Sequence, residues 1–305
     1  MTSLIIYSPA GVVAKAAPVR LAAKRLKSFG FDVEVDASAL AKHQRFAGDD
    51  DARLEAIHRV ARARPGIALP TRGGYGLTRI ADRLDWKLLA ASVAAGTRWV
   101  GMSDLTVLQM GLLAHAKAPT WWGPLACDDF GCETLDEITP DCFVEAMSGA
   151  LEAVGFRTEA GFDGLDVEGT LWGGNLAMIC SLLGTPHWPR GKGGVLLLED
   201  VAEHPYRVER MLLQLHQAGV LAAQKAIVLG EFSAWRKSPL DRGYDFKAMV
   251  QHIRGVAGVP VLTGFPFGHV PTKVTVPFGV RGQLAVQGRE AFLGWAHDHD
   301  HDHDH

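Results

Sequence analysis

The sequence lacks the features that mark disulfide-rich, membrane-spanning and nucleic-acid-binding proteins. It has only four cysteines in 305 residues, too few for a disulfide framework. No run approaches the roughly 18 consecutive apolar residues that a spanning helix needs. The formal net charge is −3, and without the four aspartates of the C-terminal run it would be +1. No charge excess therefore points to nucleic acid or to a membrane surface.

Metal-binding and targeting motifs are missing as well. The cysteines are Cys127, Cys132, Cys142 and Cys180. Their spacing fits no paired zinc pattern and no H-E-x-x-H motif occurs, so we expect free thiols and neither a metal nor another cofactor. The N-terminal residues contain no basic segment before Lys15. We therefore expect no signal peptide and a cytoplasmic location.

What is present is an ordinary globular composition, 48% hydrophobic and 21% charged, in a chain long enough for two domains. The first half alternates short apolar runs with amphipathic segments, which predicts an α/β fold with a largely parallel sheet. The predicted strands of this half are 4–7, 33–35, 67–70 and 98–100, and its predicted helices are 13–29, 51–63 and 105–116.

The second half predicts a smaller domain of mixed β/α design. Its predicted strands are 195–198, 226–229, 259–262, 273–276 and 283–286, with a helix at 205–218. We therefore predict an N-terminal α/β domain at 1–155, a linker rich in glycine and acids at 156–168, and a C-terminal domain at 169–296. The alternating His-Asp tail at 297–305 is predicted to be disordered, and a metal-binding role for it is the alternative.

The segment Gly101-Met102-Ser103-Asp104-Leu105-Thr106 lies where a predicted strand turns into a helix. A serine at such a turn projects its hydroxyl from the carboxyl edge of the sheet, and the following amide, that of Asp104, points where an oxyanion would form. The segment departs from the G-x-S-x-G pattern because Leu105 replaces the second glycine. The alternative is that Ser103 or Asp104 only caps the helix.

A second loop, Arg72-Gly73-Gly74-Tyr75-Gly76, also follows an apolar strand. Its three glycines let backbone amides approach an anion closely. The loop is not a Walker A motif, because no Gly-Lys-Ser/Thr is present. Either it forms an anion or oxyanion site, or it is a tight turn carrying an exposed arginine.

Two further residues complete a candidate triad. Glu199 and Asp200 end a predicted strand, where a carboxylate either caps the next helix or orients a histidine; we expect Asp200 to cap the helix, which leaves Glu199 for the other role. His269 follows Gly268 on a loop, where it is either solvated or a general base. Ser103, Glu199 and His269 would then follow the chain order Ser, acid, His that occurs in α/β-hydrolases.

These residues resemble the LD-carboxypeptidase family of serine peptidases, also called muramoyltetrapeptide carboxypeptidases. The resemblance lies in the joint order and spacing of short segments along most of the chain. The segments are Ser8-Pro9, Arg45-Phe46-Ala47-Gly48, the two loops above, Gly123-Pro124, Gly169-Thr170-Leu171-Trp172-Gly173-Gly174-Asn175-Leu176, Leu198-Glu199-Asp200, Glu203-His204-Pro205-Tyr206-Arg207-Val208-Glu209-Arg210 and Gly264-Phe265-Pro266-Phe267-Gly268-His269.

The resemblance implies a catalytic triad of Ser103, Glu199 and His269, with the serine on the first domain, the other two on the second, and the active site in the cleft between the domains. It implies release of the terminal D-alanine from the murein tetrapeptide L-Ala-γ-D-Glu-meso-diaminopimelate-D-Ala, through an acyl-enzyme, in peptidoglycan recycling. The backbone amides of Gly74 and Asp104 are the candidates for the oxyanion hole.

The substrate contacts follow from the reaction. A carboxypeptidase must hold a terminal carboxylate, for which Arg72 is the candidate, unless it braces its loop. Tyr75, Trp172 and Asn175 are candidates for lining the site, with packing as the alternative. The family also implies a homodimer. The expected binding partner is the murein peptide substrate, and we expect no binding to nucleic acid or to a membrane.

Two other functions remain open at this stage. One is the microcin C self-immunity branch of the same family, which cleaves a peptide–nucleotide conjugate with the same triad. The short connection between Lys192 and Val195 leaves little room for an added loop near the acid, which favours the recycling branch. The other is a catalytically silent peptide-binding protein, which the presence of all three triad residues disfavours.

Overall fold

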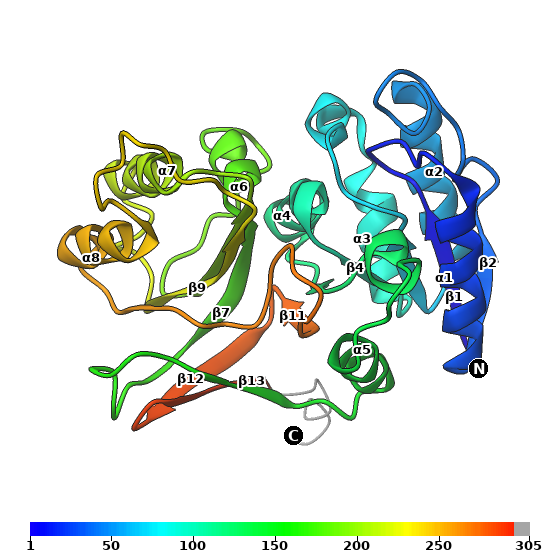
Figure 1. The fold of residues 1–305 in the computed structure, drawn as a ribbon. Coiled ribbons are helices and arrows are strands. Elements are labelled where there is room, and N and C mark those ends of the chain that lie inside the picture. Colours follow the sequence, from blue (N-terminus) through cyan, green and yellow to red (C-terminus); the bar gives the residue numbers. More distant parts are fainter. Residues whose placement is uncertain (296–305) are drawn as a thin grey trace. The chain divides into compact units, whose positions relative to one another are not determined.

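The computed structural model describes residues 1–295, and these form two compact units (Figure 1). The predicted tail at 297–305 lies outside the described residues. The first unit comprises Met1–Phe143, Gly173–Arg190 and Pro271–Gly279. The second comprises Val144–Trp172, Gly191–Val270 and the chain from Val280 onward. Each unit is described on its own below.

The first unit is built on a sheet with the strand order β11-β5-β4-β3-β1-β2. Neighbouring strands run parallel from β2 to β5, and β11 alone pairs antiparallel, as the edge neighbour of β5. The predicted parallel-type sheet is thus confirmed. Its strands are β1 (Thr2–Tyr7), β2 (Phe31–Val35), β3 (Ile67–Pro70), β4 (Arg98–Gly101), β5 (Thr120–Trp122) and β11 (Val276–Phe278).

Helices follow these strands along the chain. The helices α2, α3 and α4 pack side by side, and α1 packs against β2 and a π-helical turn at Ala126–Phe130. All four residues of β3 are buried, as expected for a central strand of a parallel sheet covered by helices. The helices are α1 (Ala16–Ser28), α2 (Asp50–Ala63), α3 (Trp86–Ala94), α4 (Thr106–Ala116), α5 (Ile138–Ser148), which continues into the second unit, and α6 (Leu176–Leu182).

The second unit contains a mixed sheet with the order β10-β9-β8-β7-β12-β13-β6. The strands β8, β9 and β10 run parallel, whereas β7, β12, β13 and β6 pair antiparallel. Helices α7 (Pro205–Gln217) and α8 (Phe246–Ala257) pack against each other. The strands are β6 (Ala153–Arg157), β7 (Asp166–Asn175), β8 (Val195–Val201), β9 (Ala226–Ser233), β10 (Val261–Leu262), β12 (Arg281–Gln287) and β13 (Glu290–Trp295).

The two units do not divide at one point of the chain, whereas the sequence analysis placed the division at 156–168. Parts of that segment belong to β6 and β7. Two later segments return to the first unit, because α6 packs on α4 and β11 pairs with β5. The strand expected at 273–276 is β11, which instead starts at Val276.

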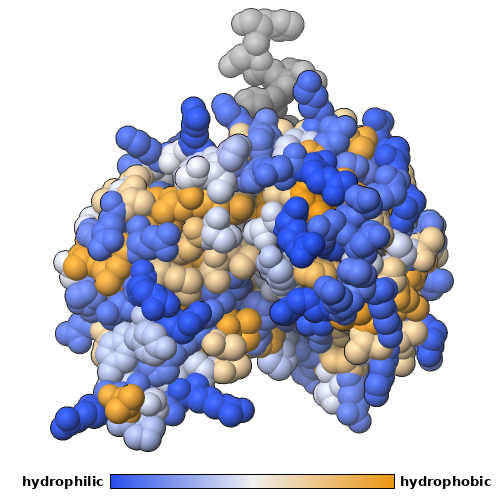
Figure 2. Space-filling model, turned by 90° about the horizontal axis from the view of Figure 1, so that it is seen from above, coloured by the Kyte–Doolittle hydropathy of each residue, from blue (hydrophilic) through white to orange (hydrophobic). Residues whose placement is uncertain are grey.

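One face of the molecule is mainly polar. Figure 2 shows hydrophilic residues over most of the visible face, with hydrophobic residues in separate patches. Within residues 1–295, no helix combines the length and the apolar character needed to cross a lipid bilayer. All four cysteines are free, as expected from their spacing.

The returning segment Pro271–Gly279 is held in the first unit by a buried ion pair. Lys273 Nζ binds Asp129 Oδ1, and both side chains are almost fully buried. The Lys273 amide donates to Thr139 Oγ1 at 2.9 Å, and that hydroxyl donates to the carbonyl of Pro271 at 2.8 Å. The charge pair and these hydrogen bonds fix the segment that leads to β11.

We expect Lys273→Met to destabilise the protein by about 3–5 kcal/mol, because it leaves the Asp129 carboxylate buried without its cation. The free energy of unfolding in urea measures the effect. The double variant Lys273→Met/Asp129→Asn removes the unpaired charge and should recover most of the loss. A loss below about 1 kcal/mol in the single variant would show that the pair does not anchor this segment.

Candidate active site

Ser103 lies on a sharp turn between β4 and α4. The turn is a 3-10 helix, Ser103–Leu105, and Ser103 has a φ of +61°, a left-handed conformation that a non-glycine residue rarely adopts. Backbone strain of this kind is held in place by surrounding structure and is concentrated at functional sites. The N-cap of α4 is Leu105, with no side-chain hydrogen bond, so the alternative that Ser103 or Asp104 caps this helix is wrong.

The glycine-rich loop packs directly on this turn. A Cβ at Gly73 would lie 2.6 Å from both Cβ and Oγ of Ser103 and 3.3 Å from the amide nitrogen of Asp104, so only glycine fits there. The Gly73 carbonyl accepts a hydrogen bond from the Gly11 amide at 2.9 Å. The structure therefore brings Ser103, the Asp104 amide and the start of the Gly73–Gly74 loop together, as the oxyanion-hole interpretation requires.

The side chain of Asp104 is fully buried beneath this loop. Its Oδ2 accepts a hydrogen bond from the Leu77 amide at 2.8 Å. Burial raises the pKa of this carboxyl to about 6, while the Leu77 amide and the positive charge of Arg53 act in the opposite direction. Asp104 thus contributes its carboxylate to the loop in addition to its backbone amide.

The other two predicted residues of the loop differ in their surroundings. Arg72 is half-buried, and its Nη1 donates to the carbonyl of Val12 at 3.0 Å, so it does brace the loop. The Tyr75 ring is 40% exposed and packs against Phe46.

Burial raises the pKa of the nearby Cys127 thiol to about 12, so this cysteine is not an activated nucleophile at neutral pH.

Glu199 and His269 form a hydrogen-bonded pair in the second unit. The Glu199 side chain is completely buried on β8, and its Oε2 lies 2.8 Å from Nδ1 of His269. A carboxylate only accepts hydrogen bonds, so Nδ1 carries the hydrogen and Nε2 is left with its lone pair. This is the arrangement in which an acid orients a general-base histidine.

Local irregularities place both residues. The β8–β9 register shifts between Leu198 and Asp200, so that Gly230 and Glu231 together span the interval occupied by Glu199. Such an irregularity re-aims a side chain beside an active site. The loop that carries His269 is hydrogen-bonded to β9. Ser233 Oγ donates to the His269 carbonyl at 2.9 Å, and the Glu231 amide donates to the Phe267 carbonyl.

The remaining predicted residues have structural contacts. Asp200 does not cap α7; it lies within β8, and the N-cap is His204, whose ring accepts from the Tyr206 amide. The Trp172 indole is buried and donates to Gln224 at 2.9 Å, which fits the packing alternative. Asn175 is also buried.

Asn175 lies close to the helix that follows Ser103. Its side chain caps α6 by accepting from the Met178 amide, and its own amide donates to Thr106 Oγ1 at 3.0 Å. Because Thr106 is the first residue of α4, Asn175 belongs to the surroundings of Ser103 in the first unit.

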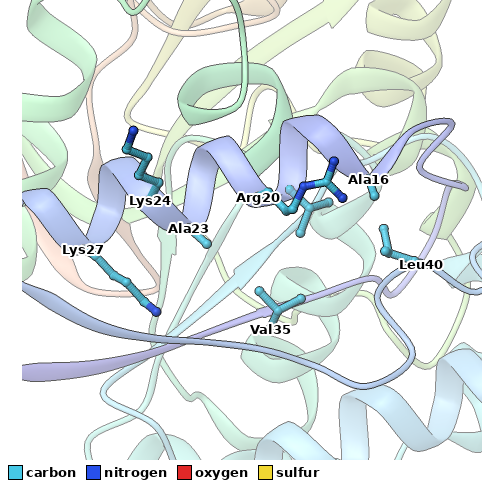
Figure 3. Close-up of a pocket in the computed structure, with 8 residues that line it drawn as sticks. Ala16, Arg20, Ala23, Lys24, Lys27, Val35 and Leu40 are labelled. Carbon is cyan, nitrogen blue, oxygen red and sulfur yellow. The ribbon is translucent and has the colours of Figure 1, made fainter.

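One surface groove lies apart from these residues. Within residues 1–295, no three His, Cys, Asp or Glu side chains come together in a way that would hold a metal ion. A groove of about 440 Å³ runs along α1 beside Val35 and Leu40, flanked by Arg20, Lys24 and Lys27 (Figure 3). No candidate site residue lines it, so it does not belong to the candidate active site.

Arg53, which is not among the residues predicted from the sequence, lies under the glycine-rich loop. Arg53 is fully buried on α2, where its Nη2 binds Asp50 and its Nη1 donates to the Pro9 carbonyl at 3.4 Å. Gly76 packs so closely on this guanidinium that an added Cβ would have to displace its Nη1. A signal was present, because Arg53 occupies the apolar stripe formed by Ala56, Ile57 and Val60 at helical spacing.

Comparison with known proteins identifies one family. The protein-family model of the LD-carboxypeptidase N-terminal domain matches residues 4–123. The family model of the LD-carboxypeptidase C-terminal domain matches residues 168–284. A putative carboxypeptidase of Streptomyces coelicolor is 34% identical over 268 residues, covering 85% of this chain and 83% of that protein. The N-terminal match includes Ser103, and the C-terminal match includes Glu199 and His269.

Solved structures agree with these matches. A muramoyltetrapeptide carboxypeptidase from Oxalobacter formigenes is 41% identical, with a TM-score of 0.89 over 97% of this chain and 99% of that one. The microcin C7 self-immunity protein MccF, in complex with glutamyl sulfamoyl guanosine, has a TM-score of 0.84 over 97% and 96% of the two chains, with 20% identity. At that identity the likeness shows the fold alone.

We expect Gly73→Ala to lower the rate at which a fluorophosphonate labels Ser103 by about 10²-fold, because the added methyl must displace the serine side chain by about 1 Å. Labelling is followed by mass spectrometry. Gly255→Ala is the matched control, because this glycine of α8 faces open space and has an ordinary φ. Equal labelling of Gly73→Ala and wild type would contradict the packing of the loop on Ser103.

Proposed function

The chain belongs to the LD-carboxypeptidase family, and on this premise we propose that it is a serine carboxypeptidase that releases the terminal D-alanine from murein tetrapeptides. The substrate is L-Ala-γ-D-Glu-meso-diaminopimelate-D-Ala, and the product is the corresponding tripeptide. The structural relative from Oxalobacter formigenes is a muramoyltetrapeptide carboxypeptidase, which supports this substrate class. The reaction belongs to the recycling of cell-wall fragments, and the proposal includes a cytoplasmic homodimer.

The observation that carries the proposal is the pair formed by Glu199 and His269. A fully buried carboxylate 2.8 Å from an imidazole nitrogen fixes the tautomer and the orientation of the ring. It also stabilises the imidazolium that forms when the ring accepts a proton. A helix cap or a solvated loop histidine would not need this arrangement.

Acylation follows from the roles of the proposed triad. His269 Nε2 takes the proton of Ser103 as Oγ attacks the carbonyl carbon at the L-centre of diaminopimelate. The negative charge that develops on the carbonyl oxygen is stabilised by the amides of Asp104 and Gly74, each worth about 3–4 kcal/mol in a formed oxyanion hole. The imidazolium then protonates the leaving amine, and D-alanine departs.

Deacylation reverses the proton path. Water attacks the ester carbonyl while His269 takes its proton, and the serine oxygen leaves with that proton restored. Arg72 uses Nη1 to brace the glycine-rich loop, and its remaining guanidinium donors are proposed to hold the terminal carboxylate, with Tyr75 and Asn175 proposed as neighbours of the bound peptide. The chemistry requires neither a metal nor a cofactor.

We expect wild-type protein to remove one alanine from murein tetrapeptide, and Ser103→Ala to remove none, as measured by mass spectrometry of the peptide. Thr134→Ala is the control for an effect of any single substitution, because Thr134 is exposed and lies outside the segments 72–76 and 101–106. Loss of alanine with wild type and with Thr134→Ala, but not with Ser103→Ala, would establish the reaction and the nucleophile together.

A second substrate distinguishes the proposed reaction from the two alternative functions. An aminoacyl sulfamoyl nucleoside, the kind of ligand bound by the MccF structure, is offered in parallel. Faster cleavage of this conjugate than of the tetrapeptide would replace the proposal with the conjugate-cleaving reaction. Turnover of neither substrate, with tight binding of the tetrapeptide, would replace it with a peptide-binding protein.

We expect Glu199→Gln to lower kcat by about 10⁴-fold with the fold retained, because the neutral amide no longer holds the required tautomer of His269. Steady-state kinetics and the melting temperature measure the two effects. Glu168→Gln is the control, because Glu168 is exposed on the neighbouring β7. A kcat within tenfold of wild type would remove Glu199 from the triad.

A further inference from the structure

We propose that the side chain of Asp104 is a positioning residue, which holds the glycine-rich loop so that the Gly74 amide is aimed at the oxyanion. This inference deepens the proposed function and rests on it. Asp104 thereby has two separate roles, because its backbone amide is one oxyanion donor and its carboxylate fixes the loop that supplies the other.

The carboxylate holds the C-terminal end of the loop. Oδ2 of Asp104 accepts the hydrogen bond of the Leu77 amide at 2.8 Å, and the whole side chain is buried. Leu77 directly follows Gly76 and begins a short 3-10 helix, Leu77–Arg79. The bond therefore links the residue after Ser103 to the point at which the loop re-enters regular structure.

The N-terminal end of the loop is held by other groups. The Gly73 carbonyl accepts from the Gly11 amide at 2.9 Å, and Arg72 donates to Val12 at 3.0 Å. Between the two ends lies Gly74, which is exposed and has a φ of +100°. Since glycine backbone is permissive, the orientation of its amide depends on how firmly both ends are fixed.

The positive charge of Arg53 stabilises the buried Asp104 carboxylate. Its guanidinium is fully buried, packs against Gly76 and acts on the Asp104 carboxyl through its charge. The Phe46 ring lies 4.8 Å from it. An ionised acceptor makes a stronger hydrogen bond to an amide than a neutral one, which explains a carboxylate at this position.

The capping role expected for a residue at this turn is not available as an alternative. No side-chain hydrogen bond caps α4, and the Asp104 carboxylate is directed to the loop rather than to the first turn of its own helix. The bond spans 27 residues of sequence, so it is a tertiary contact between the two active-site loops of the first unit.

The experiment compares Asp104→Ala and Asp104→Asn with wild type. Asparagine keeps an oxygen that can accept from Leu77, whereas alanine does not. Hydrogen exchange of peptides spanning residues 71–80 reports on the loop. Kinetics with murein tetrapeptide report kcat and KM, and fluorophosphonate labelling reports on Ser103 without that substrate. Asp32→Ala, at an exposed aspartate of β2, is the control.

For Asp104→Ala we expect faster exchange in residues 71–80, and a fall in kcat and in the labelling rate of about 10²-fold with KM within about twofold. Asp104→Asn should restore slow exchange and most of the rate. A merely structural role would lower stability without this selective loss of kcat and its recovery with asparagine. Should Asp104→Ala fail to fold, Asp104→Leu fills the space without an acceptor and is expected to behave as described for alanine.

Two results would overturn the inference: unchanged exchange in residues 71–80 without the acceptor, or faster exchange with kcat and labelling unchanged. Failure of the proposed function has a different signature, which is wild-type protein that releases no D-alanine. In that case exchange and the labelling of Ser103 still decide whether Asp104 positions the loop.

Discussion

The contact between the backbone of Gly73 and the side chain of Ser103 constrains the whole first unit. It requires β3 and β4 to be neighbours with their carboxyl ends together, because the two loops leave from those ends. It excludes any side chain at residue 73 and fixes Ser103 in a left-handed conformation. The parallel sheet and its helices therefore serve to hold two short loops against each other, as is common at the carboxyl edge of α/β sheets.

Much of this arrangement could be predicted from the sequence because its signals are local. The apolar run 67–70 leads into a glycine-rich loop and the run 98–100 leads into Gly101, and the structure has β3 ending at Pro70 and β4 ending at Gly101. The sheet types of both halves were predicted correctly. The hydrogen bond between Glu199 and His269 joins residues 70 apart. Residue type and chain order made them only a candidate pair, because spacing gives no distance between them, and resemblance to a family then implied their pairing.

Tertiary contacts explain what could not be predicted. The return of the chain to the first unit depends on β11 pairing with β5 and on the buried Lys273–Asp129 pair, and neither has a local signature. Asp200 looked like a helix cap because of its residue type, but β8 continues to Val201 and His204 occupies the cap. Arg53 would have been assigned to a solvated face by its charge, although its position on the apolar stripe of α2 indicated burial.

The two halves of the proposed machinery use the same physical device. In each, a fully buried carboxylate accepts a hydrogen bond from a loop that ordinary packing would leave adjustable: Asp104 from Leu77, and Glu199 from His269. Burying a carboxylate is unfavourable unless it is hydrogen-bonded, so the loop that satisfies it is held strongly and in one orientation. The two carboxylates differ in role because their hydrogen-bond donors differ. The Leu77 backbone amide keeps its hydrogen, whereas the His269 imidazole can accept and release a proton at its second nitrogen. Asp104 can therefore only position, while Glu199 orients a group that moves protons.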